Sequence, residues 1–159
     1  MDRRTLGGWL EGPGAGLPDA DPQAYRGERL GLPREGAFSV ASVGRRILAL
    51  TIDWFAAVFI TRLIAPRVEY GSDASALLVL ATFGVVTALL VWLMGASIGH
   101  RLMGLQVVQL GAGGTSRVPL LASVVRTALL CLVVPAVIWD RDTRGLHDKA
   151  ARTVVVKTS

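Results

Sequence analysis

The chain has 159 residues, of which 52% are hydrophobic, and its 17 basic and 12 acidic residues give a formal net charge of +5. This length suits one domain. The apolar residues are clustered in long runs, which favours a small multi-pass membrane protein over a soluble globule. The basic residues flank those runs, as the positive-inside rule and anionic lipids require. The sequence has no cluster of aromatic and basic residues of the kind that binds single-stranded nucleic acid. We therefore expect the lipid bilayer, and not nucleic acid, as a partner.

Residues 1–43 are rich in Gly, Pro and charges of both signs, and they sustain no apolar period. This composition predicts a flexible, mostly disordered tail. Residues 44–159 are predicted to form a single membrane domain, in which the apolar segments lie at about 47–65, 74–94 and 119–138. A polar C-terminal tail, 139–159, follows them.

The first apolar segment is preceded by Arg45 and Arg46, and it is long enough to span a bilayer. Asp53 lies inside it, seven residues after Arg46 and on the same helix face. A charge at the centre of a bilayer costs at least ~2.5 kcal/mol. We therefore expect Asp53 to face the interior of a helix bundle and to have a partner there.

The second apolar segment contains no charged residue, and its small residues Gly84 and Ala88 predict close packing against the first helix. The next stretch, 95–104, contains three glycines and Arg101, and we expect His100 to lie on the surface. Residues 105–110 are predicted to form a strand, 111–114 a turn and 115–118 a return strand.

The third apolar segment leaves the topology open. Three full crossings distribute the basic residues almost evenly between the two sides of the membrane, whereas two crossings place nearly all of them on one side. The second arrangement favours two cytoplasmic termini and a third segment that is re-entrant or interfacial. It also lets a strand at 153–156 pair with 105–110 in a small cytoplasmic β element. Against it, ~20 apolar residues are long enough to span.

Arg126 lies within the third segment at a depth similar to that of Asp53, if both segments start on the cytoplasmic side. One hypothesis is therefore an Asp53–Arg126 ion pair inside the bundle. The alternative places Arg126 on the wet face of an interfacial helix, with Asp53 paired to Arg46 or to a backbone group.

Three blocks of sequence are similar to the signature of a known family. They are Arg46-x-x-Ala49-x-x-Ile52-Asp53, Gly95-Ala-Ser-Ile-Gly99-His-Arg101-Leu-Met-Gly104-Leu-Gln-Val-Val108 and Arg144-Gly-Leu-His147-Asp148-Lys149. Over roughly residues 40–157 the chain resembles the RDD family of small integral membrane proteins, which is named for one arginine and two aspartates. The resemblance implies that these residues are Arg46, Asp53 and Asp148. We expect supporting roles for Arg126, Arg101, Gly95, Gly99, Gly104 and His147. Arg152 is a departure, because similar proteins often have a small residue there.

Two functions remain open. The resemblance favours a small transporter or ion-exchange component, in which Asp53 binds a proton or cation and Arg126 or Arg46 tunes its affinity. The alternative is a membrane scaffold or accessory subunit, in which Asp148, Arg101 and the glycines organise a β cap that docks a partner.

The sequence contains no Ser/His/Asp set, carboxylate pair or metal-ligand spacing. We therefore expect no enzyme activity, no catalytic residue, no cofactor and no metal, and we interpret His147-Asp148 as a hydrogen-bonded turn at the membrane surface. One protomer has too few helices to enclose a path, which indicates a homo-oligomer or a second membrane protein as partner. The expected location is the plasma (inner) membrane, multi-pass, with a cytoplasmic N-terminus.

Overall fold

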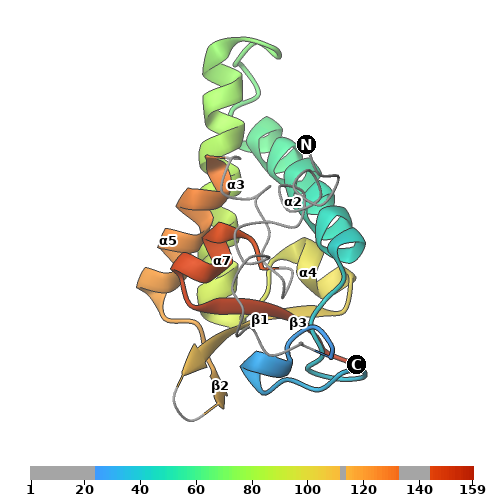
Figure 1. Ribbon diagram of the computed structural model, residues 1–159. Helices are drawn as coiled ribbons and strands as arrows, with labels where there is room; N and C mark the ends of the chain where they lie inside the picture. The colour runs from blue at the N-terminus through green and yellow to red at the C-terminus, as the bar shows by residue number, and fades with distance from the viewer. Residues whose placement is uncertain (1–23, 112–113, 133–143) are drawn as a thin grey trace, which may run out of the picture.

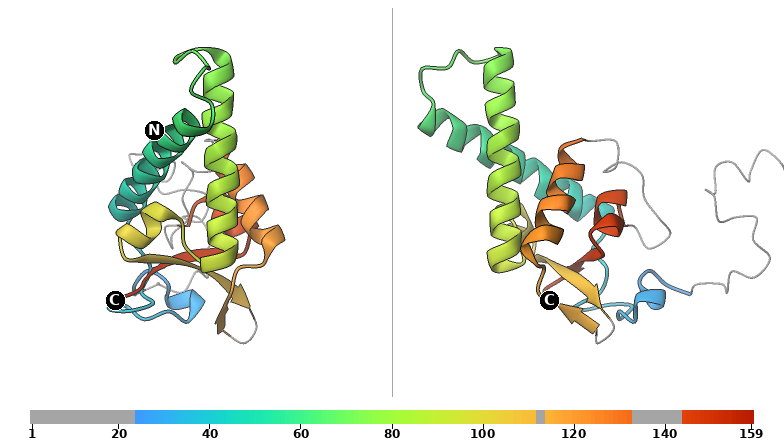
Figure 2. Two further views of the ribbon diagram at one scale, coloured as in Figure 1. Left: turned by 180° about the vertical axis from the view of Figure 1, so that it is seen from behind. Right: turned by 90° about the vertical axis from the view of Figure 1, so that its left-hand side faces the viewer.

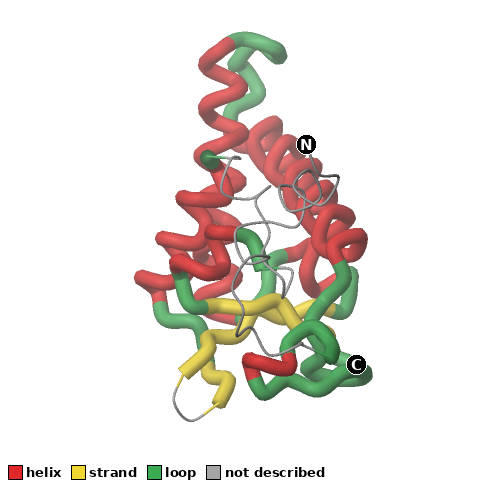
Figure 3. The backbone as a smooth tube through the Cα atoms, viewed as in Figure 1, coloured by secondary structure: helices red, strands yellow, loops and turns green. Residues whose placement is uncertain are grey.

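The computed structural model describes residues 24–111, 114–132 and 144–159 (Figure 1). Two long helices, α2 (Val43–Ile64) and α3 (Asp73–Met94), form the upper part of the molecule. A sheet of three antiparallel strands in the order β2-β1-β3 lies across the end where α2 begins and α3 ends (Figures 1 and 3). The elements around them are the turn η1 (Glu28–Leu30), the helices α4 (Ile98–Leu102), α5 (Leu120–Cys131) and α7 (Leu146–Ala150), and the strands β1 (Leu105–Gly111), β2 (Gly114–Ser116) and β3 (Thr153–Lys157).

Helices α2 and α3 are long and apolar enough to cross a membrane, and they match the first two predicted segments. Each has 22 residues, or about 33 Å, compared with a hydrocarbon core of about 30 Å. Only 22% of the most apolar stretch of α2, and 28% of that of α3, is buried inside the protein. The core helix of a soluble protein is mostly buried, whereas these helices turn most of their apolar surface outward, as lipid contact requires.

Each long helix buries one narrow stripe at a spacing of three or four residues. The stripe on α3 contains Phe83, whose ring contacts that of Trp54 on α2, with 5.9 Å between the ring centroids. Nearer the far end, the hydroxyl of Thr61 lies 2.9 Å from that of Thr82. The stripe on α2 consists mainly of small or polar residues, which allows close packing: Arg46, Ala49, Asp53, Ala57 and Thr61.

The small residues of α3 face α5 rather than α2. The carbonyl oxygen of Ala88 accepts a hydrogen bond of 2.6 Å from the hydroxyl of Ser123. A Cβ atom added at Gly84 would lie 3.6 Å from the Sγ atom of Cys131. The predicted packing of this pair against the first helix is therefore wrong, because the larger side chains of α3 meet α2.

The predicted pairing of the two strands is confirmed: β1 and β3 are antiparallel, with Val107 opposite Val155. The other edge of β3 pairs with residues 38–41, since the Ala41 N–H donates to the Val155 carbonyl over 3.0 Å. The predicted flexible tail of 1–43 is therefore wrong for its last residues. Strand β3 has neighbours on both edges, and its side chains are buried on both faces.

Three chain segments meet in this sheet. Residues 38–41 precede α2, β1 follows α3, and β3 ends the chain, so all three lie at the same end of the long helices (Figure 2). Helix α5 starts from that end, and its 12 residues extend about 18 Å, too short to cross a bilayer. The third apolar segment is predicted to extend to 138, but 133–143 lie outside the described residues.

Candidate functional site

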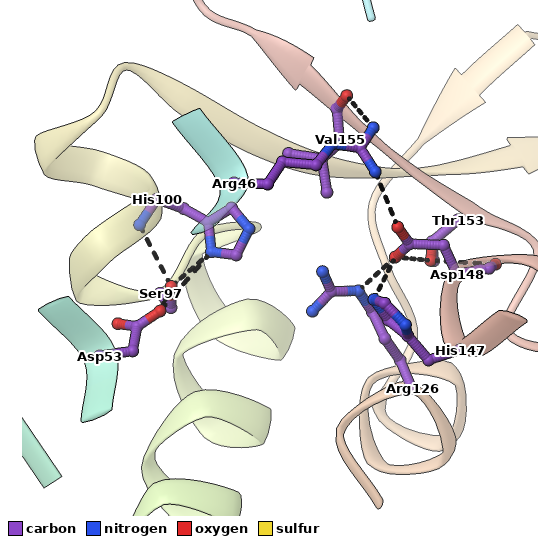
Figure 4. A network of polar contacts seen from close by, with 9 residues as sticks. All are labelled: Arg46, Asp53, Ser97, His100, Arg126, His147, Asp148, Thr153 and Val155. Carbon is purple, nitrogen blue, oxygen red and sulfur yellow. Dashed lines mark hydrogen bonds and ion pairs between the residues drawn. The ribbon is translucent and has the colours of Figure 1, made fainter. Parts of the chain in front are cut away.

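The first of two buried polar clusters is centred on Asp148 of α7 (Figure 4). The Asp148 side chain is completely buried. Its Oδ2 atom accepts a bond of 3.2 Å from Arg46 Nη1, and its Oδ1 atom one of 2.7 Å from Arg126 Nε. Thr153 Oγ1 lies 3.3 Å from Oδ1. We call these four residues the Asp148 cluster. It joins α2, α5, α7 and β3.

The charges of this cluster keep Asp148 ionised. Burial by itself raises the pKa of Asp148, but Arg126, His147 and Arg46 together lower this pKa to about 2. Arg46 also donates to the main chain, since its Nη2 atom lies 3.1 Å from the Val155 carbonyl oxygen. A carboxylate buried this deeply stays ionised only because cationic side chains lie beside it.

The second cluster is a row of hydrogen bonds that starts at Asp53 in the middle of α2. The Ser97 hydroxyl bonds to Asp53 Oδ2, and the Gly99 N–H donates to Asp53 Oδ1 over 2.7 Å. The Ser97 hydroxyl is also bonded to the Nδ1 atom of His100 and accepts the His100 backbone N–H over 3.2 Å, which caps α4. We call Asp53, Ser97 and His100 the Asp53 row.

The structure corrects two predictions about these residues. The predicted Asp53–Arg126 ion pair is wrong, because α7 places Asp148 against Arg126 instead. Of the alternative partners, Arg46 is also bound to Asp148, and the Gly99 backbone group is bound to Asp53. His100 is not on the surface but 7% exposed. Burial and the nearby Arg126 lower its pKa to about 3, so the ring is neutral at physiological pH.

The glycines position α4 and the sheet. A Cβ atom at Gly99 would lie 2.7 Å from the carbonyl carbon of Ala49, so α4 contacts the backbone of α2 directly. Gly95 ends α3 in the left-handed conformation, and Gly104 adopts it before β1, with φ angles of 69° and 64°. Arg101 is exposed on α4 and belongs to neither cluster.

His147 differs from its prediction as well. It lies in α7 and is 6% exposed, with its Nε2 atom 3.6 Å from Asp148 Oδ1. The expected turn at the membrane surface is instead a short helix, in which His147 and Asp148 are buried. Burial of α7 against α5 gives Arg126 a partner without exposing it to water.

A cavity of about 60 Å³ separates the two clusters. Its polar lining comes from both sides: His100 from the Asp53 row, and Arg46, Arg126 and Asp148 from the Asp148 cluster, with His147 beside them. The Nη1 atom of Arg126 is buried and has no hydrogen-bond partner among the described residues. In the described parts of the chain, no three His, Cys, Asp or Glu side chains come together as a metal site requires.

Comparison with known proteins identifies the family. A sequence model of the RDD family matches residues 40–152, which is most of the chain. The chain belongs to the RDD family. No curated protein and no solved structure matches it. The match begins at the segment that pairs with β3 and includes every residue of the two polar clusters of this RDD protein except Thr153.

The residues expected to be the RDD signature fall in two places. Arg46 and Asp148 are in direct contact, while Asp53 begins the row that reaches the cavity through His100. Sequence analysis missed Ser97 and Thr153. For Ser97 a signal exists, because a serine before a short helix is a preferred N-cap. For Thr153 there is none, since its contact with Asp148 depends on the turn between α7 and β3.

Proposed function

We propose that this RDD protein is a small membrane transport or ion-exchange component, rather than an enzyme, in which Asp53 takes up and releases a proton. The observation that carries the proposal is the Asp53 row, which connects a carboxylate in a membrane-type helix with a small cavity. Ionisable groups inside membrane segments typically serve proton or ion pathways. The RDD membership supports a membrane setting.

The row can hold one additional proton without moving a heavy atom. A serine hydroxyl has one donor and two acceptor positions. With Asp53 ionised, Ser97 donates to Asp53 and accepts from Nδ1–H of His100. With Asp53 protonated, Asp53 donates to Ser97, Ser97 donates to Nδ1, and the imidazole proton is on Nε2. Ser97 accepts the His100 backbone N–H in both states, so all its positions are filled in each.

Proton transfer along this row is balanced. A proton that arrives at Nε2 of His100 displaces the Nδ1 proton to Ser97, and the Ser97 proton passes to Asp53. One proton enters from the cavity and one arrives on the carboxylate, while His100 is neutral before and after. The ring edge that bears Nε2 is turned toward the Asp148 cluster (Figure 4), so the route begins at the cavity.

Proton flux into proteoliposomes that contain a pH-sensitive dye tests this function. Gradients of monovalent cations or anions are imposed on the wild-type chain, Asp53→Asn and the matched control Asp73→Asn, whose side chain is exposed at the start of α3. We expect gradient-driven flux in the wild type and in Asp73→Asn, and its loss in Asp53→Asn. An inactive wild-type chain, or an Asp53→Asn variant as active as wild type, refutes the proposal.

The second candidate is a membrane scaffold or accessory subunit. The Asp148 cluster favours it, since one carboxylate fixes the positions of two helices through Arg46 and Arg126. Buried ion pairs of this kind can specify an arrangement more than they stabilise it. Light scattering of Asp148→Asn in detergent tests this function. A changed subunit number, in a protein with no proton flux, supports the scaffold, while an unchanged one refutes it.

We also propose that the chain lies in the inner membrane with its N-terminus in the cytoplasm, as an oligomer or with another membrane protein. Thiol labelling in intact cells tests the orientation in a Cys131→Ser background. A cysteine placed at Ser42 or at Ser159 should be protected from a membrane-impermeant reagent in both cases, because both positions flank the same sheet. Labelling of either from outside contradicts this orientation.

A further inference from the structure

The Asp148 cluster contains more positive than negative charge. Arg46 and Arg126 share the single carboxylate of Asp148, and the three side chains are 7%, 2% and 0% exposed. Excess charge that is buried this deeply is costly unless another group compensates it. Arg126, the less exposed of the two arginines, lines the cavity beside this cluster.

Arg126 shows where such a group would bind. Its Nε atom donates to Asp148, but its buried Nη1 atom has no partner among the described residues. A guanidinium group has only donors. The missing partner is therefore a hydrogen-bond acceptor, and because Arg126 lines the cavity, that acceptor belongs inside it.

We propose that the cavity binds one small monovalent anion of about the size of chloride, held by Nη1 of Arg126 and Nε2–H of His100. The volume of about 60 Å³ suits an ion of this size and excludes a nucleotide or a sugar phosphate. The apolar walls come from Ile47, Leu50, Leu130 and Val155. Such surroundings strengthen the attraction between the anion and the guanidinium group.

This inference rests on the proposed proton uptake by Asp53, and it deepens that function by naming the ion. His100 donates from Nε2 only when Asp53 is protonated. Among the described residues of the two clusters, ionised Asp53 and Asp148 match the charges of Arg46 and Arg126. With Asp53 protonated, a bound anion restores the balance. Proton and anion therefore bind together. In the described parts of the chain, the titratable or charged groups around the cavity and in the row are Arg46 and Asp53 of α2, His100 of α4, Arg126 of α5, and His147 and Asp148 of α7.

Equilibrium dialysis with radioactive chloride tests the site on the full chain in detergent. Gluconate, which is too large for the cavity, keeps the ionic strength constant, and non-radioactive bromide serves as competitor. We expect saturable binding of one chloride per chain, displaced by bromide. The affinity should increase as the pH falls, by at most about tenfold per pH unit for one linked proton.

Arg126→Lys keeps the charge beside Asp148 but removes Nη1, so chloride affinity should decrease about tenfold or more. The matched control is Arg101→Lys at an exposed position, which should bind as the wild type does. Absence of saturable binding, or equal affinity in Arg126→Lys and wild type, overturns the site. Equal affinity at pH 6 and pH 8 overturns its coupling to Asp53.

The binding and flux measurements separate the two proposals. Saturable chloride binding without gradient-driven proton flux establishes the anion site and refutes the transport function. Proton flux that follows cation gradients, in a chain that binds no chloride, supports the transport function and refutes the anion site. If Arg126→Lys does not fold, Asp53→Asn provides the second variant. Because the amide introduced by Asp53→Asn cannot ionise, the chloride affinity of this variant should lose its dependence on pH.

Discussion

Replacing Gly99 with alanine tests the closest approach between α4 and α2. The added Cβ atom would lie 2.7 Å from the Ala49 carbonyl carbon, whereas ordinary contact begins at 3.4 Å. Since the Ala49 oxygen is closer still, α4 must move by about 1 Å or more. The bond from Gly99 N–H to Asp53, now 2.7 Å, would then be lost. Overpacking costs about 1–3 kcal/mol and a hydrogen bond to a charged group about 1.5–3 kcal/mol, so we expect a loss of about 3–5 kcal/mol.

Denaturation in detergent, followed by tryptophan fluorescence, measures this free energy of unfolding. The matched control is Gly44→Ala, which lies near the start of α2, is exposed, and has no atom within 4 Å of the added Cβ. Alanine favours helix, so the control should be stabilised by up to about 1 kcal/mol. A Gly99→Ala variant that loses less than about 1 kcal/mol would show that the contact between α4 and α2 is not rigid.

Three further predictions use the same measurement of unfolding free energy. Asp148→Asn removes the carboxylate charge that Arg46 and Arg126 share, and this variant should lose about 3–5 kcal/mol, while the exposed control Asp73→Asn should change little; equal losses contradict this account. His100 is held neutral in the folded state, with a pKa of about 3, while the unfolded state takes up its proton near pH 6.5. The folded state therefore binds fewer protons between these values, and stability should decrease as the pH falls through that window, by at most about 1.4 kcal/mol per pH unit; an equally steep decrease in His100→Gln contradicts this. Arg152 has a φ angle of 52°, so Arg152→Gly should relieve strain and stabilise the chain by about 1 kcal/mol, and a destabilised variant would contradict that reasoning.

The parts of the fold that depend on local pattern could be predicted from the sequence. Apolar runs of bilayer length predicted α2 and α3 to within a few residues, because length and hydrophobicity alone decide such helices. The small residue expected at Arg152 has a physical reason in its left-handed conformation. The count of basic residues favoured a common side for both ends of the chain, which stays a prediction; in the structure, Val40 before α2 pairs with Val156 of β3.

The partners in the site could not be predicted, because they depend on tertiary placement. Equal depth along two helices suggested Asp53 and Arg126 as partners. Depth does not show how each helix is rotated about its axis, or whether another helix places a different carboxylate next to Arg126. Asp148 lies 102 residues from Arg46, and it reaches Arg126 only because the five-residue helix α7 packs on α5. His100 was expected at the surface because its neighbour Ser97 was not recognised as a cap that turns the ring inward.

The Asp148 cluster itself argues for the path of the third apolar segment. Asp148 follows that segment, whereas Arg46 stands at the start of the first helix, and their side chains are 3.2 Å apart. A third segment that crossed the bilayer would place Asp148 about 30 Å from Arg46, on the opposite face. The ion pair between them could not then form. The ion pairs and the pairing of β3 with both β1 and residues 38–41 therefore all bring residues 146–157 to the end of the molecule where α2 begins.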